Sequence, residues 1–237
     1  MSVLCIDCGN TRVKWGLRQG NAWADRGALP LSELGGLAVP ADRIVACNVA
    51  GDPPRLTLEA MAARLGLAVE WVHARSSQCG VTNGYEHPGQ LGADRWAALI
   101  GARALHRGDC VVVMCGTATT IDLLTADGQF RGGLILPGLA MMRDALAGGT
   151  ANLPTAAGNF AEQPRNTFNA IASGALQATA GAIERMYRQI ANGRDPICLL
   201  SGGAAGGVSP RLTLPLRSVD NLVLEGLAAI AGGSENA

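Results

Sequence analysis

Residues 3–17 read VLCIDCGNTRVKWGL and contain the clearest indication of secondary structure in the chain. An apolar run ends in a Gly-Asn pair, and alternating apolar residues follow at Val13, Trp15 and Leu17. A run of this kind, a tight turn and an alternating return predict a β-hairpin. We expect a third strand at Ala22–Leu29.

A second stretch repeats this pattern in the middle of the chain. Residues 110–124 read CVVVMCGTATTIDLL. Aligned without gaps, Ile6–Thr11 lies over Val113–Ala118, so that Cys-Gly falls on Cys-Gly. A third strand is again expected, at Phe130–Leu136. The repetition favours duplicated α/β domains, and chance similarity between two buried strands remains the alternative.

The remaining segments of the two halves also correspond. Strands are expected at Arg43–Val49, Ala68–His73 and Pro196–Leu200, helices at Arg55–Leu65, Ala93–Leu105, Leu139–Leu146, Asn169–Asn192 and Leu222–Ala231, and a loop at Thr150–Pro164. The predicted fold class is therefore α/β. Its two duplicated domains, over residues 1–105 and 106–237, would face each other across an interdomain cleft that carries the two glycine turns.

The composition excludes several classes of function. The chain has 19 Lys+Arg and 19 Asp+Glu and no basic cluster, which argues against nucleic-acid binding. Its only lysine, Lys14, follows Val13 where a Walker A loop needs glycine. No apolar run reaches the roughly 18 residues of a membrane helix, and we see no secretory signal. Seven cysteines in apolar contexts predict reduced thiols and a cytoplasmic location.

Asp7 is the most informative residue of the first hairpin. A carboxylate inside an apolar strand is costly unless it is paired or bound to a metal. The turn amides of Gly9, Asn10 and Thr11 can form a concavity for a phosphate, and Lys14 adds a positive charge. We interpret this segment as a nucleotide site in which Asp7 binds hydrated Mg²⁺. The alternative is that Asp7 caps the turn and Lys14 is solvated.

Two further glycine-rich segments fit a nucleotide site. Residues 116–120 (GTATT) repeat the turn with three hydroxyls and no charge, which is a weak signal by itself. Glycines within Ser201–Ala205 (SGGAA) would let the backbone approach an adenosine closely.

Asp94 opens the predicted helix at Ala93–Leu105. A carboxylate in a first helical turn usually serves as a cap or a dipole partner, and the sequence alone favours that interpretation. The alternative is a general base beside Arg95, whose guanidinium would hold an anionic group of the substrate. Tyr85 precedes this pair in a loop and could contact the same substrate.

Six segments together resemble one known family. They are IDCGNTRVKWGL, GADRWAALIGAR, CGTATTIDLL, GGLILPGL, NTFNAIASGAL and LSGGAA, in this order along nearly the whole chain. In them the sequence resembles the type III pantothenate kinases of the acetate and sugar kinase/Hsp70/actin superfamily. The resemblance implies two ribonuclease H-like domains, a homodimer, and ATP-dependent phosphorylation of pantothenate to 4′-phosphopantothenate, the first step of coenzyme A biosynthesis.

The resemblance also assigns roles to individual residues. It implies that ATP is bound by Asp7, Cys8, Gly9, Asn10, Thr11, Arg12, Val13, Lys14 and Thr117, with Mg²⁺ near Asp7 through water. It implies that pantothenate is bound by Tyr85, Gly92, Ala93, Asp94, Arg95 and Thr167, the last near a dimer interface. The family's proton acceptor falls on Asp94.

One position departs from the family pattern. The family commonly has an aspartate before its second glycine turn, where it helps to bind a monovalent cation, and this chain has Met114. A thioether cannot replace a carboxylate at a hard cation such as K⁺ or NH₄⁺. Dependence on such a cation is therefore in doubt, or it uses other oxygen ligands.

Two other functions stay open from the sequence. The chain could phosphorylate a different small hydroxyl or carboxylate substrate, or it could be a non-catalytic regulator that keeps the fold. Retention of Asp7, Lys14 and Asp94 argues against a regulator, whereas Met114 argues mildly for one.

Overall fold

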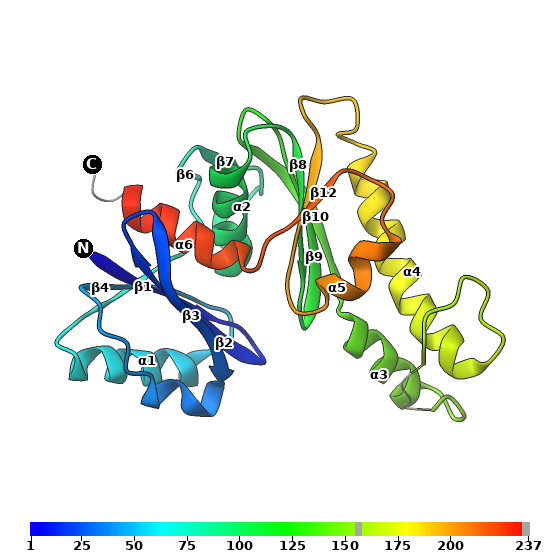
Figure 1. Ribbon diagram of the computed structural model, residues 1–237, viewed down its shortest axis with the longest axis horizontal. Coiled ribbons are helices and arrows are strands. Elements are labelled where there is room, and N and C mark those ends of the chain that lie inside the picture. Colours follow the sequence, from blue (N-terminus) through cyan, green and yellow to red (C-terminus); the bar gives the residue numbers. More distant parts are fainter. Residues whose placement is uncertain (155–157, 234–237) are drawn as a thin grey trace. The chain divides into compact units, whose positions relative to one another are not determined.

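The computed structural model describes residues 1–154 and 158–233 (Figure 1). The chain forms two compact units. Unit 1 comprises residues 1–107, residues 128–130 and the chain from Asn221 onward, and unit 2 comprises residues 108–127 and 131–220. The helix at the C-terminal end thus groups with the N-terminal part of the chain. Division into domains of 1–105 and 106–237 stays a prediction.

A five-stranded sheet forms the centre of unit 1. Its strands lie in the order β3-β2-β1-β4-β5. β1 pairs antiparallel with β2, and β2 with β3, which confirms the predicted hairpin and third strand, while β4 runs parallel to β1 and β5 to β4. The bounds are β1 (Ser2–Cys8), β2 (Arg12–Gln19), β3 (Ala22–Pro30), β4 (Arg43–Asn48) and β5 (Val69–Trp71).

The two faces of this sheet are covered by different helices (Figure 1). α1 (Asp52–Arg64) and the 3₁₀ turn η1 (Leu31–Gly36) pack on one face, and α2 (Ala93–Leu105) and α6 (Leu222–Gly233) belong to the other. Successive residues of a strand point to opposite faces. Leu4, Ile6 and Cys8 enter the core beneath α1, so Asp7 projects toward the opposite face.

α2 and α6 cross closely because glycine lies at their contact. A Cβ atom on Gly226 would collide with the carbonyl oxygen of Ala97. Short elements that sequence patterns missed complete unit 1: β6 (Ser77–Gln78), β7 (Val81–Asn83) and η2 (Pro88–Gln90). β7 pairs with Gln129 and Phe130, the first residues of β10, which return to unit 1.

Unit 2 repeats the strand order of unit 1. Its strands lie as β12-β11-β8-β9-β10, with β8 and β9 antiparallel, β11 parallel to β8, and β12 parallel to β11. This is the order of β5-β4-β1-β2-β3, as expected for duplicated units. The bounds are β8 (Cys110–Cys115), β9 (Ala118–Leu124), β10 (Gln129–Pro137), β11 (Ile197–Ser201) and β12 (Leu216–Ser218).

Helix α4 (Thr167–Tyr187) covers one face of the unit 2 sheet. Ile183 and Met186 of α4 pack against Val113 and Ile121 of the strands. The helix ends earlier than the predicted Asn192, because the chain tightens into i→i−3 hydrogen bonds from Gln189 onward. The other helical elements are α3 (Leu139–Gly149), α5 (Ala205–Val208) and η3 (Ser209–Arg211). Among the described residues, no helix has the length and apolar character needed to cross a membrane.

Candidate functional site

Asp7 lies in a row of three polar side chains on one face of the unit 1 sheet. It pairs with Lys14 of β2 on one side and with Cys47 of β4 on the other. Nζ of Lys14 is 3.8 Å from Oδ2 of Asp7, and Sγ of Cys47 is 3.6 Å from Oδ1. The carboxylate therefore has an ammonium against one oxygen and a thiol donor against the other.

Burial dominates the ionisation of this carboxylate. Asp7 is 5% exposed, and burial raises its pKa to about 6. The positive charge of Lys14 lowers this pKa, the negative charge of Asp94 raises it, and the hydrogen bond from Cys47 lowers it. Burial also raises the pKa of Cys47 well above its usual value, so that the thiol keeps the proton that it donates. Above pH 6 the row therefore contains a buried carboxylate that favours cationic neighbours.

The residues of the predicted ATP segment differ in accessibility. Asn10, Thr11 and Arg12 are exposed at the turn, and Lys14 is half-buried beside it, with 34% of its side chain accessible. Cys8 and Val13 point into the core beneath α1, so only their backbone groups can meet a ligand. The turn is therefore accessible from solvent, with the ammonium of Lys14 beside it.

Asp94 stands in the first turn of α2, where the helix begins without a side-chain cap at Gly92. Its Oδ1 accepts a hydrogen bond of 2.8 Å from the backbone N–H of Arg95, one of the first-turn N–H groups that have no partner within the helix. In the part of the chain that the structure describes, its Oδ2 makes no hydrogen bond. One oxygen therefore supports the helix, and the other is available as a proton acceptor.

Arg95 is held by two aromatic rings of unit 1. It is 5% exposed, and its Nη1 donates a hydrogen bond of 2.7 Å to the hydroxyl of Tyr85. The guanidinium carbon lies 5.5 Å from the Tyr85 ring centre and 5.9 Å from that of Phe130, and the two rings lie 5.3 Å apart. Both are cation–π distances, so the rings restrict the orientation of the guanidinium.

Phe130 is a residue of this site that sequence reasoning missed. It is fully buried, and it reaches Tyr85 and Arg95 because the start of β10 returns to unit 1 and pairs with β7. An aromatic residue inside a strand pattern looks like ordinary core, and nothing in its local sequence signals contact with Arg95.

Most of the chain matches one family of known proteins. Residues 3–189 match the family model of the type III pantothenate kinases. Over 235 residues the chain is 54% identical to a type III pantothenate kinase from Aromatoleum aromaticum, with 97% of each chain covered. The chain belongs to the type III pantothenate kinase family.

The fold of this chain is similar to that of several solved structures. The chain superposes on a protein from Campylobacter jejuni described as a Baf family transcriptional activator with a TM-score of 0.61 at 18% identity, covering 99% of this chain and 100% of that one. It also superposes on a Sinorhizobium meliloti protein assigned as a 2-dehydro-3-deoxygalactonokinase with a TM-score of 0.60 at 16% identity, covering 97% and 98%. Identities this low concern the fold alone. With the two mixed sheets and the family, they confirm the predicted α/β fold class of two-domain actin-like kinases.

The second glycine turn of this kinase-family chain joins β8 and β9 in unit 2. Thr117 is exposed in the turn, and its carbonyl oxygen accepts a hydrogen bond of 2.9 Å from the N–H of Gly138. Met114 occupies the place that Asp7 has in unit 1, and it pairs with Thr120 and Ser201. A thioether and two hydroxyls thus stand where unit 1 has a carboxylate, an ammonium and a thiol. This row offers a hard cation no charged ligand.

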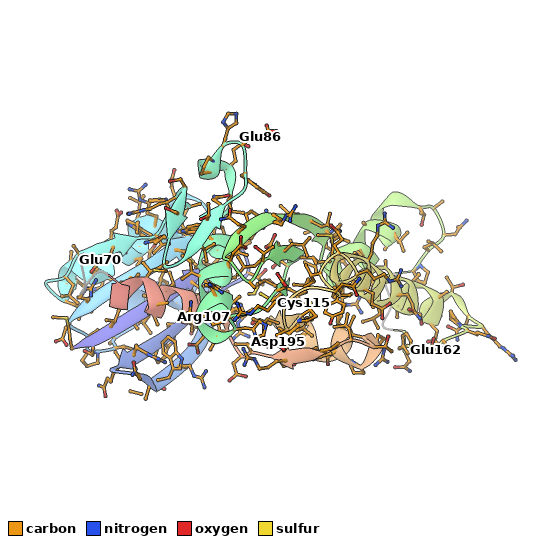
Figure 2. All side chains as sticks on the ribbon, turned by 90° about the horizontal axis from the view of Figure 1, so that it is seen from above. Glu70, Glu86, Arg107, Cys115, Glu162 and Asp195 are labelled. Atoms are coloured by element: carbon orange, nitrogen blue, oxygen red, sulfur yellow. The ribbon has the colours of Figure 1, made fainter. Side chains whose placement is uncertain are left out.

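Two other predicted segments of the kinase lie in unit 2. Thr167 is the exposed first residue of α4, and the side chain of Asn166 before it caps the helix by accepting from the N–H of Asn169 at 2.9 Å. Gly202 has a φ of 101°, and a Cβ atom there would collide with the backbone of Cys115, the last residue of β8. Cys115 is labelled in Figure 2. The glycine at position 202 is therefore required by the fold itself.

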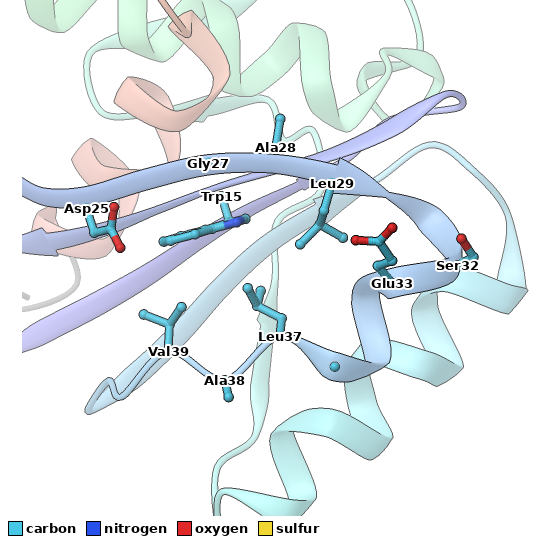
Figure 3. A pocket seen from close by; sticks show the side chains of 11 residues that line it. Trp15, Asp25, Gly27, Ala28, Leu29, Ser32, Glu33, Leu37, Ala38 and Val39 are labelled. Atoms are coloured by element: carbon cyan, nitrogen blue, oxygen red, sulfur yellow. The ribbon is translucent and has the colours of Figure 1, made fainter.

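A groove of about 750 Å³ opens on unit 1 (Figure 3). Trp15, Leu29, Leu37 and Val39 give it an apolar lining, with acidic side chains beside them, among them Glu33. None of the residues predicted to bind ATP or pantothenate lines it. The groove therefore shares no lining residue with the candidate site at Asp7 and the start of α2.

Proposed function

We infer that this chain phosphorylates the primary hydroxyl of pantothenate with ATP and so forms 4′-phosphopantothenate in coenzyme A biosynthesis. Membership of the type III pantothenate kinase family supports this function. The observation that carries it is the start of α2, where the Asp94 carboxylate keeps one oxygen without a hydrogen bond in the described chain and Arg95 follows directly. A proton acceptor beside a fixed cation suits a substrate that has both a hydroxyl and a carboxylate.

In this proposal ATP is bound by the first glycine turn, with Lys14 facing a phosphate. Mg²⁺ usually binds proteins through one or two carboxylates together with substrate phosphates. Asp7 fits that role because its buried carboxylate offers hard oxygen ligands, and within residues 1–154 and 158–233 no group of three or more His, Cys, Asp or Glu forms a self-sufficient metal site. When bound, Mg²⁺ would neutralise phosphate charge as the phosphoryl group is transferred.

The residues of α2 act on pantothenate. Oδ2 of Asp94 accepts the proton of the primary hydroxyl as that oxygen attacks the γ-phosphate. Arg95, oriented by Tyr85 and Phe130, binds the pantothenate carboxylate and fixes the direction of the hydroxyl. Positioning and charge neutralisation supply most of the catalysis in phosphoryl transfer.

The function is tested by measuring ADP release from ATP with and without pantothenate. We expect ADP to form only when pantothenate is present, and phosphopantothenate to appear in equal amount. Other small hydroxy acids in its place should give little ADP. Folded protein that releases no pantothenate-dependent ADP would refute the proposed activity.

Replacing Lys14 by alanine should raise the KM for ATP roughly 10- to 100-fold, as expected for loss of one charged hydrogen bond. The KM for pantothenate should change little, and the fold should persist because the Lys14 side chain is 34% exposed. Steady-state kinetics with each substrate varied measures both values, and Lys14→Arg, which keeps the charge, serves as the control. An unchanged KM for ATP in Lys14→Ala would show that the ammonium contacts no phosphate.

Replacing Arg95 by lysine should raise the KM for pantothenate roughly 10- to 100-fold. A guanidinium can bind a carboxylate through two N–H groups while a further N–H donates to Tyr85, and an ammonium lacks this planar arrangement. The KM for ATP is the internal reference and should stay within about 3-fold, below the effect of losing one charged hydrogen bond. Tyr85→Phe, which keeps the ring and removes only the hydroxyl, should give a smaller rise. Equal rises in both KM values for Arg95→Lys would indicate general damage and contradict the substrate role.

A further inference from the structure

We propose that Cys47 is a positioning residue for Asp7, whose carboxylate it holds in the orientation that the nucleotide site requires. This inference rests on the proposed role of Asp7 in binding ATP. Neither the sequence motifs nor the family resemblance draws attention to Cys47, which stands on β4, far along the chain from the glycine turn.

The backbone places the thiol directly beside the carboxylate. In the parallel pairing of β1 and β4, Asp7 is opposite Cys47, and their side chains project from the same face. Sγ of Cys47 lies 3.6 Å from Oδ1 of Asp7, within reach of an S–H···O hydrogen bond. Because Oδ2 lies toward Lys14, each carboxylate oxygen has its own partner, and the plane of the group is defined by two neighbours.

The two partners differ in how firmly they are held. The Lys14 side chain is long and 34% exposed, so its ammonium can leave Asp7 to follow a phosphate. Cys47 is fully buried in the middle of the sheet and has a single short side-chain torsion. The thiol therefore keeps its contact with Oδ1 when the ammonium turns toward a ligand. This contact then holds the carboxylate of Asp7 in its orientation.

The chain contains a matched cysteine that lacks this contact. Cys5 is fully buried two residues before Asp7 on β1 and projects from the same face. Its neighbours across the sheet are Gly16 and Val45, which offer no side-chain acceptor. Truncating Cys5 removes the same atom from the same layer and leaves Asp7 untouched, so it measures packing alone.

Unit 2 suggests the conservative replacement. Ser201 stands in the strand position that Cys47 has in unit 1, opposite Met114 of the neighbouring strand. Its hydroxyl is buried and donates a hydrogen bond of 3.4 Å to the backbone oxygen of Asp220. The fold therefore accepts a serine at this place, and Cys47→Ser keeps a donor next to Asp7.

The test compares Cys47→Ala, Cys47→Ser and Cys5→Ala. Binding of a non-hydrolysable ATP analogue with Mg²⁺ is measured by calorimetry, the KM for each substrate by ADP release, and stability by thermal unfolding. Loss of a hydrogen bond to a charged group should weaken analogue binding and raise the KM for ATP about 10-fold in Cys47→Ala, with the KM for pantothenate unchanged. Cys47→Ser should recover most of the binding. Cys5→Ala should lower the melting temperature as much as Cys47→Ala does and leave analogue binding at the wild-type value.

Three results would overturn the role of Cys47. The first is that Cys47→Ala binds the ATP analogue as tightly as the wild type. The second is that Cys5→Ala loses as much analogue binding as Cys47→Ala. The third is that Cys47→Ser has the wild-type melting temperature and yet recovers no analogue binding. Failure of the proposed function looks different. In that case wild-type protein binds the analogue but releases no ADP with pantothenate, and the order of the three variants in analogue binding still tests Cys47.

Discussion

Replacing Asp94 by asparagine should lower kcat for pantothenate phosphorylation by roughly 10²- to 10⁴-fold, the usual contribution of a positioned general base. Asparagine keeps the oxygen that accepts from the N–H of Arg95, so the start of α2 and the placement of Arg95 should persist. What it loses is the basicity of the second oxygen. Single-turnover rates with saturating ATP and pantothenate measure the effect, and the Kd of a non-hydrolysable ATP analogue should stay near the wild-type value.

A second first-turn carboxylate provides the control for this variant. Asp52 opens α1 in the same unit and is exposed, so Asp52→Asn changes the same chemical group at a comparable helix position. It should leave kcat unchanged. Full turnover in Asp94→Asn would show that its carboxylate is no more than a helix cap, and would move the proton acceptor elsewhere without refuting kinase activity.

Local patterns were enough to predict the hairpin that carries Asp7 and Lys14. An apolar strand, a two-residue turn signal and an alternating return define a hairpin, and the short connection limits which residues can face each other. The start of α2 at Ala93 can likewise be predicted from neighbouring residues, because a glycine precedes it and apolar residues with helical periodicity follow it. These two segments contain nearly all of the candidate site residues.

Contacts between distant segments could not be predicted from these patterns. Cys47 reaches Asp7 through a parallel pairing, whose register depends on how a crossover packs and not on any turn sequence. Phe130 reaches Arg95 because two residues of β10 return to unit 1. The last helix also groups with unit 1, where Gly226 lets it approach Ala97, and one glycine gives no sign of its partner. Tertiary packing determines all three.

Replacing Asp7 by asparagine should make the protein more stable at neutral pH while it loses most of its activity. The pKa of Asp7 rises from 3.8 to about 6 on folding, chiefly because burial disfavours the charged form. A raised folded-state pKa gives a stability contribution that is fully present below the unfolded-state pKa and is lost as pH rises through the folded-state pKa. At pH 7.5 the buried charge therefore lowers the free energy of unfolding of the wild type by about 1–3 kcal/mol, since one pKa unit corresponds to about 1.4 kcal/mol.

Asparagine has no such charge, so urea unfolding should give the variant a higher free energy of unfolding at pH 7.5 by about that amount. The difference should shrink between pH 6 and pH 4, the window set by the two pKa values. Asp42→Asn is the control of opposite sign. Hydrogen bonds from Ser2 lower the pKa of Asp42, so this exposed site should lose stability at neutral pH when its charge is removed. An Asp7→Asn variant that is less stable than wild type at pH 7.5 would show that Lys14 and Cys47 compensate the buried charge fully. A gain in stability together with loss of nucleotide binding would identify Asp7 as a charge retained for its ligand at the expense of the fold.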